Sequence, residues 1–103
     1  MKAIDVMLNV VVPKSLEEEF VDRLLESPDL VRGFTSYPIS GHGGRMATAS
    51  VSERVRGRSD RVLFQIGMGR DDVEALLGQL RAGVPNPEIA WWVLPVEGFG
   101  RLL

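Results

Sequence analysis

The stretch from residue 33 to residue 61 carries most of the side chains that could take part in chemistry. It contains the only histidine of the chain, His42, and five of its arginines: Arg45, Arg54, Arg56, Arg58 and Arg61. His42 stands between Gly41 and Gly43, and glycine permits positive φ angles and a close approach of the backbone to a ligand. The pattern predicts a glycine-rich turn that binds a ligand, followed by a basic loop.

An anion is one candidate ligand of this stretch. Arginine binds carboxylate or phosphate through two parallel hydrogen bonds, and the amides of a glycine-rich turn can form an anion nest. We therefore expect a ligand site formed by Gly41, His42, Gly43, Gly44, Arg45, Arg58 and Arg61. The alternative is a solvated loop, with Glu53 and Asp60 as partners of the arginines. Nucleic acid is not expected, because the formal net charge is −2 and aromatic residues do not interleave with the arginines.

A metal ion is the second candidate ligand, with His42 and Glu53 as its ligands and Asp60 as a further oxygen donor. The chain has no cysteine, which excludes thiolate sites and disulfides. Zinc sites normally take three or four protein ligands, so one chain cannot complete such a site alone. Copies related by symmetry would have to contribute. The alternative is that His42 only caps a turn.

Catalysis is not expected, since no second histidine exists and no G-x-S-x-G nucleophile motif is present. The alternative is a small enzyme that uses His42 as acid or base while arginines hold an anionic substrate.

The elements around this stretch follow from the hydrophobic pattern. Alternating apolar residues predict strands over residues 3–12, 30–39, 61–68 and 88–96. Helical spacing predicts two helices, which begin at the capping boxes Ser15–Glu18 and Asp71–Glu74 and end before Pro28 and at Gly83. The order predicts one α+β domain over residues 1–103 with a ferredoxin-like fold. It predicts an antiparallel four-stranded sheet with both helices on one face and with the first and third strands central. The second strand contains Pro38, which indicates either an edge position or a strand end at that residue.

This layout leaves one sheet face without helices. Met7, Val11, Leu63 and either Trp91 or Trp92 would point there, while the other tryptophan would lie in the core. Apolar side chains exposed together mark association surfaces, so we expect a homo-oligomer. The alternative is that the tail with Leu102 and Leu103 covers this face. No apolar segment approaches the ~20 residues of a membrane span, and the start has no signal-peptide layout, so we expect a cytoplasmic protein.

The motifs resemble those of a known superfamily. Gly33-Phe34-Thr35, then Ser40 to Gly43, a polar loop and a third strand resemble the nitrogen-regulatory PII proteins. The whole chain resembles more closely one branch of the PII-like superfamily, with its PII and CutA-like fold: small proteins often encoded beside heavy-metal efflux systems. The marks of that branch are Pro13 to Glu18, Gly33 to Ser36, Gly41 to Gly43, Val55 to Arg58 and Trp92 to Val96.

The resemblance implies a regulatory trimer. Its clefts between subunits would hold a small ligand at Gly41 to Gly43, and the T-loop-like connection over residues 44–60 would signal to a partner such as a membrane transporter. Nucleotide-binding members hold phosphates with a basic glycine-rich loop after the second helix. Here residues 82–88 have one glycine and no basic residue. Adenine nucleotide is therefore less expected than another small ligand or a divalent or monovalent metal ion. The alternative is a structural oligomer without ligand.

Overall fold

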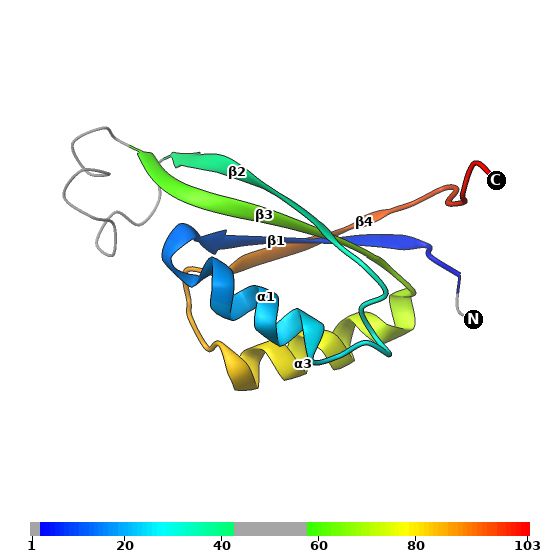
Figure 1. Ribbon diagram of the computed structural model, residues 1–103, viewed down its shortest axis with the longest axis horizontal. Coiled ribbons are helices and arrows are strands. Elements are labelled where there is room, and N and C mark those ends of the chain that lie inside the picture. Colours follow the sequence, from blue (N-terminus) through cyan, green and yellow to red (C-terminus); the bar gives the residue numbers. More distant parts are fainter. Residues whose placement is uncertain (1–2, 43–57) are drawn as a thin grey trace.

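The computed structural model describes residues 3–42 and 58–103. These residues form a four-stranded antiparallel sheet in the order β2-β3-β1-β4, with β1 at Val6–Pro13, β2 at Thr35–His42, β3 at Arg58–Met68 and β4 at Ala90–Pro95. The helices α1 (Glu17–Leu25) and α3 (Val73–Gly83) both lie on one face of the sheet (Figure 1). The predicted α+β architecture, the two central strands and the edge position of the strand with Pro38 are confirmed.

The central strand β1 determines which side chains enter the core. It pairs with β3 from Val6 opposite Met68 to Pro13 opposite Arg61, and with β4 from Val6 opposite Pro95 to Val11 opposite Ala90. Successive side chains of a strand point to opposite faces. Val6, Leu8, Val10 and Val12 therefore share the helix-covered face, and each is at most 1% exposed.

The helices close the core with an apolar stripe each. Phe20 of α1 packs on Phe64 of β3, with ring centroids 4.8 Å apart, and Phe34 reaches the same ring at 6.0 Å. The α3 stripe consists of Val73, Leu76, Leu77 and Leu80, all buried. Helical periodicity therefore predicted both helices and the buried face of α3 correctly. In α1, Phe20 and Leu24 are buried, but Leu25, which follows the same spacing, is 64% exposed.

The predicted side-chain caps of the helices are wrong. A 3-10 turn over Lys14–Leu16 precedes α1, and another over Arg70–Asp72 precedes α3; neither α-helix has a side-chain cap hydrogen bond. The physical reason is that the main chain satisfies the first amides itself. The amide of Glu17 donates to the carbonyl of Lys14, and the amide of Val73 donates to that of Arg70.

The second and third strands differ from prediction at their ends. β2 begins at Thr35 instead of residue 30, because the chain first turns after α1, where the Val31 amide donates to the Ser27 carbonyl at 2.8 Å. At the other end β2 continues to His42, which lies opposite Arg58 at the start of β3. The connection between the two strands is therefore residues 43–57. It lies outside the described residues.

The second sheet face carries Met7, Val11, Leu63 and Trp92, as predicted. The prediction that the other tryptophan is a core residue is wrong. Trp91 and Trp92 are both 43% exposed, because β4 is an edge strand and Trp91 lies at the margin of the helix layer. Leu102 and Leu103 are fully exposed and do not cover this face. Within the described part of the chain, no helix is long and apolar enough to cross a membrane.

Adjacent leucines in α1 test this packing. Leu24 is fully buried, whereas Leu25 is 64% exposed. We expect Leu24→Ala to lower the free energy of unfolding by about 2–5 kcal/mol through lost burial and a residual cavity. Leu25→Ala is the control and should stay within about 0.5 kcal/mol of the wild type. Urea denaturation measures both, and equal effects would contradict the assigned helix face.

Candidate functional site

The predicted glycine-rich turn is the end of a strand pair. Gly41 and His42 are the last residues of β2, and they lie opposite Ser59 and Arg58 of β3. His42 and Arg58 are exposed at this end of the sheet. The prediction of a turn at Gly41 and His42 is therefore wrong, because the ladder between β2 and β3 runs further than the hydrophobic pattern shows. The two residues nevertheless frame the connection of residues 43–57.

Gly41 stands in a crowded position. A Cβ atom at this position would lie 2.8 Å from the Ser59 Oγ and 3.2 Å from the Arg61 Cγ. Ser59 is only 6% exposed, and its Oγ accepts a hydrogen bond from the Arg61 Nε at 2.9 Å. The missing side chain of Gly41 thus leaves room for Arg61 to lie flat across the end of β2.

Arg61 is held by a carboxylate from a distant part of the chain. Its Nη2 lies 3.6 Å from the Glu88 Oε2, and the two side chains are 13% and 11% exposed. Glu88 belongs to the loop after α3, where its amide donates to the Asn86 Oδ1 at 2.8 Å. An anion that bound to Arg61 would therefore have to compete with Glu88.

Four of the seven predicted ligand residues come together at this end of the sheet: Gly41, His42, Arg58 and Arg61. Gly43, Gly44, Arg45 and the predicted metal ligand Glu53 lie outside the described residues. Among the residues that are described, no group of three or more His, Asp or Glu side chains could hold a metal ion.

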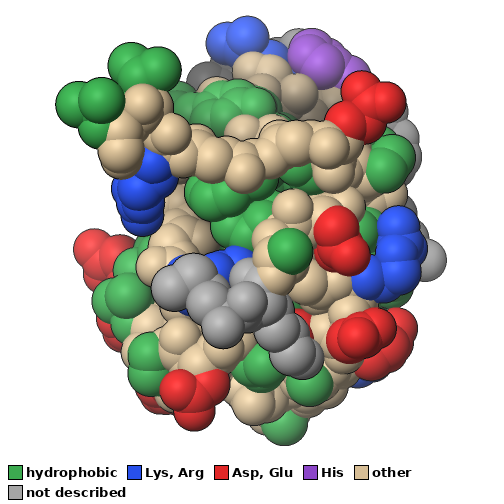
Figure 2. Space-filling model, turned by 90° about the vertical axis from the view of Figure 1, so that its right-hand side faces the viewer, with side chains coloured by type: hydrophobic (Ala, Val, Ile, Leu, Met, Phe, Trp, Pro, Cys, Tyr) green, Lys and Arg blue, Asp and Glu red, His purple; other side chains and the backbone are tan. Residues whose placement is uncertain are grey.

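The structure reveals a cavity at the opposite end of the same sheet face that the sequence did not predict. It has a volume of about 370 Å³. Four parts of the chain line it: Ile4 and Met7, residues 32–35 before and at the start of β2, Gln65 and Gly67 of β3, and Phe99 and Arg101 of the tail. Figure 2 views the end of the molecule where the described chain starts and finishes, and hydrophobic side chains are visible there in a recess.

The floor of this cavity is largely apolar, and the side-chain amide of Gln65 is hydrogen-bonded there. The Gln65 Nε2 donates to the Asn9 Oδ1 at 3.1 Å, and the Asn9 Nδ2 donates to the Met7 carbonyl at 3.2 Å. Two cations, Arg32 and Arg101, line the cavity, and neither has an ion-pair partner among the described residues. Apolar surface next to cations that carry no counter-charge suits a ligand with an apolar part and a negative charge.

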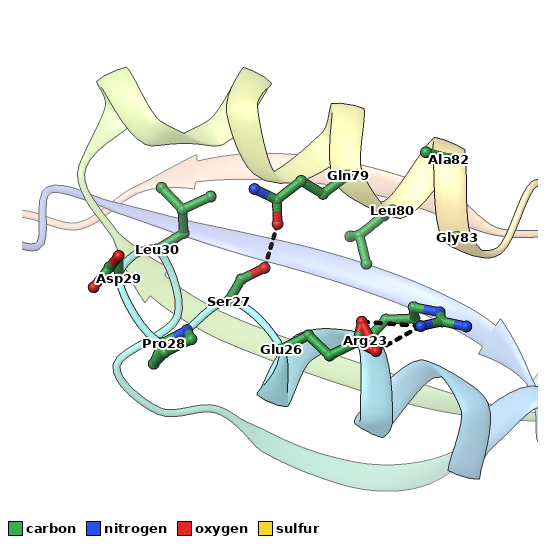
Figure 3. Close-up of a pocket in the computed structure, with 10 residues that line it drawn as sticks. All are labelled: Arg23, Glu26, Ser27, Pro28, Asp29, Leu30, Gln79, Leu80, Ala82 and Gly83. Carbon is green, nitrogen blue, oxygen red and sulfur yellow. Dashed lines mark hydrogen bonds and ion pairs between the residues drawn. The ribbon is translucent and has the colours of Figure 1, made fainter.

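A larger hollow of about 720 Å³ lies between α1 and α3 and has a different character (Figure 3). The Arg23 Nη1 donates to both carboxylate oxygens of Glu26, at 2.6 and 2.9 Å, so its charge is already paired. The hydroxyl of Ser27 donates to the side-chain oxygen of Gln79. Gly83 allows Arg23 to pass, since a Cβ there would lie 2.7 Å from the Arg23 Cδ. We interpret this hollow as the groove between two helices joined by their own polar side chains.

The fold is that of the PII-like proteins, a ferredoxin-like α+β fold with two helices on one face of the sheet. Over 98% of both chains, the structure has a TM-score of 0.70 with CPII, described as a nitrogen regulatory PII-like protein from Thiomonas intermedia K12 bound to ADP, AMP and bicarbonate. The two sequences are 17% identical, so this likeness shows the fold.

The chain belongs to the DUF3240 family, described as a protein of unknown function, whose pattern matches residues 2–103. A crystal structure of a DUF3240 family protein from Shewanella baltica OS155 has a TM-score of 0.78 and 20% identity, over 99% of this chain and all of the other. The comparison with curated proteins returned no match. The predicted PII-like fold is confirmed. Membership of the PII-like superfamily and the link to heavy-metal efflux stay predictions.

Enlarging Gly41 tests the crowding at the end of β2. We expect Gly41→Val to destabilise the protein by about 1–3 kcal/mol, because the new methyl groups must displace Ser59 and Arg61. Gly33→Ala is the matched control: no atom lies within 4 Å of a Cβ at that position, so its effect should stay below about 1 kcal/mol. Thermal unfolding followed by circular dichroism compares them. A neutral Gly41→Val would contradict the close packing of these three residues.

Substituting Glu88 tests the ion pair with Arg61 that connects the loop after α3 to β3. We expect Glu88→Ala to cost about 1–3 kcal/mol, since it leaves the mostly buried Arg61 without its carboxylate. Glu74→Ala is the control. It breaks the exposed pair with Arg81, whose atoms are 3.8 Å apart, and should change stability by less than about 0.5 kcal/mol. If chemical denaturation gave both variants the same small effect, the Arg61–Glu88 pair would have no structural role.

Proposed function

We propose that this protein is a PII-like regulatory sensor and not an enzyme. It binds a small ligand in a cleft between subunits and signals through the connection between β2 and β3. The observation that supports this most directly is the placement of arginines near both ends of β3. Arg61 and Arg58 lie at one end of β3, and the cavity with Arg32 and Arg101 lies at the other.

The separation of these two places argues for a site shared between copies. From Ser59 to Gly67 the strand β3 covers roughly 26 Å at about 3.3 Å per residue. One small ligand cannot reach both ends within one chain. Two copies that meet through this face can bring the base of one connection next to the cavity of the other.

The face between the two places is suited to such an association. Met7, Val11 and Leu63 lie along its centre, and the half-exposed Trp92 and Leu94 lie on its edge strand. Burying a large apolar side chain stabilises an interface by roughly 1.5–3 kcal/mol. We propose a homotrimer, the assembly that the resemblance to PII proteins implies.

The proposed ligand has an apolar or flat part and one or two negative charges. The cavity supplies the apolar floor and two arginines, while Glu88 beside Arg61 disfavours a polyphosphate at the other end. The PII-like neighbour CPII is described as bound to ADP, AMP and bicarbonate. All three are anions, and AMP combines a flat base with two negative charges. Metal binding by His42 and Glu53 is a weaker proposal, since the described residues add no further ligand.

The partner in this proposal is a membrane transporter, contacted by the arginine-bearing connection of residues 43–57. Ligand contacts at the base of a loop can order that loop, and ordering changes the surface that a partner meets. His42 and Arg58 stand at the two ends of this connection, so a ligand held there would act on it directly.

Isothermal titration with AMP, ADP, ATP, bicarbonate and divalent metal ions tests the binding. We expect AMP or ADP to bind more tightly than ATP. Arg101→Gln should weaken that binding about five- to tenfold, because it removes a charge-assisted hydrogen bond. Arg70→Gln is the control: Arg70 is exposed in the 3-10 turn before α3, and its substitution should leave affinity unchanged. Absence of binding for every compound would favour the structural oligomer.

The assembly is measured independently by light scattering. A mass of three chains is expected, and Trp92→Glu should reduce it to one, because a charge would be buried at the interface. Hydrogen exchange then follows residues 43–57 with and without the bound ligand. Unchanged protection in a ligand-bound trimer would contradict the signalling part of the proposal alone.

A further inference from the structure

A separate cavity of about 200 Å³ lies where α3 ends and β4 begins. Its floor is part of the hydrophobic core, since Val10, Phe20, Leu77 and Leu80 are between 0 and 7% exposed and line it. An unfilled hollow that reaches fully buried side chains offers a ligand more apolar surface than a surface groove does.

One wall of this cavity is Trp91, which is 43% exposed. The next residue, Trp92, has the same exposed fraction, but it faces the other side of the sheet, where it is aligned with Asn9. An aromatic side chain beside an apolar cavity offers a flat surface on which another ring can stack. The pair Trp91 and Trp92 also provides a matched control within one strand.

The remaining wall is a loop that is fixed by its own hydrogen bonds. The Val84 amide donates to the Leu80 carbonyl at 2.8 Å, and the Ile89 amide donates to the Asn86 carbonyl at 3.1 Å. The Asn86 side chain accepts from the Glu88 amide at 2.8 Å. The cavity is therefore preformed, and ligand binding would not carry the entropic cost of ordering this wall.

A single charged side chain, Arg81, lines the cavity. It lies 3.8 Å from Glu74, and the two side chains are 62% and 78% exposed. An ion pair this open to water is weak, so the guanidinium can bind another carboxylate.

We propose that this cavity binds a single-ring aromatic carboxylate, with the ring in the hollow beside Trp91 and the carboxylate on Arg81. The size agrees, because an apolar cavity of about 150 Å³ in another protein holds benzene. The site is distinct from the proposed cleft between subunits, which uses the opposite face of the sheet. Its loop carries Glu88, the partner of Arg61, so the cavity is linked by direct contacts to the base of the β2–β3 connection.

Phenylacetate, titrated in parallel with its neutral counterpart toluene, tests the site. We expect phenylacetate to bind with a dissociation constant of roughly 0.1–1 mM, the range that small ligands of this size reach. In Trp92→Phe the remaining Trp91 should still report binding by fluorescence. In Trp91→Phe the fluorescence change should vanish, and calorimetry should show affinity lowered at least threefold. No binding up to about 10 mM overturns the proposal.

Arg81→Gln distinguishes the contribution of the ligand's carboxylate to binding from that of its ring. This substitution should lower the affinity for phenylacetate about fivefold and leave the affinity for toluene unchanged. Arg70→Gln should change neither affinity. Val84→Phe should fill the cavity and abolish both, provided that circular dichroism shows a folded protein. If Val84→Phe does not fold, the comparison of phenylacetate with toluene in Arg81→Gln still tests the proposed site. Equal loss for Trp91→Phe and Trp92→Phe, or no selectivity in Arg81→Gln, would place the ligand elsewhere.

Discussion

The pairing of β1 with β3 on one side and with β4 on the other is the constraint on which the rest of the structure depends. The register places Val6, Leu8, Val10 and Val12 under the helices. A slip of one residue would turn these side chains to the other face and bring Asn9 into the core. Both α1 and α3 pack on the surface that this register creates (Figure 1).

The same register places the polar groups of the uncovered face. Asn9 is 2% exposed and lies between Gln65 and Trp92 on its neighbouring strands, and it is satisfied by the Gln65 amide and by the Met7 carbonyl. A buried amide that finds its partner only in one alignment makes other alignments costly. This polar pair therefore supports the register from the side that has no helices.

Much of the fold follows from local patterns, because alternation and helical spacing are themselves local. They predicted β1, β3, both helices and the uncovered face. The helix starts were mistaken because a 3-10 turn of the main chain satisfies amides that a serine or aspartate side chain would otherwise satisfy. Trp91 was mistaken for a core residue because alternation assigns a face, but it does not show how far the helices extend over an edge strand.

The candidate site was predictable only where its residues are close in sequence. Gly41, His42 and Arg58 were predicted in a turn and a loop, but they belong to the paired strands that lead into the β2–β3 connection. The crowding around Gly41 depends on Ser59 and Arg61 of the opposite strand. The Arg61–Glu88 pair joins β3 to the loop after α3, which no local pattern relates. The cavity with Arg32 and Arg101 needs the C-terminal tail to lie beside the segment before β2. That arrangement is a property of the tertiary structure.

The position of β1 in the sheet also has a consequence for how the chain folds. Both of its partners come much later in the sequence, and its final neighbour β4 is the last strand before the tail. Contacts between distant segments must close long loops first, which slows folding relative to helical proteins of the same size. During synthesis the apolar strand β1 has two unpaired edges until β3 and then β4 emerge from the ribosome. Until then these unpaired edges are open to pairing with other chains, which makes the nascent protein prone to aggregation.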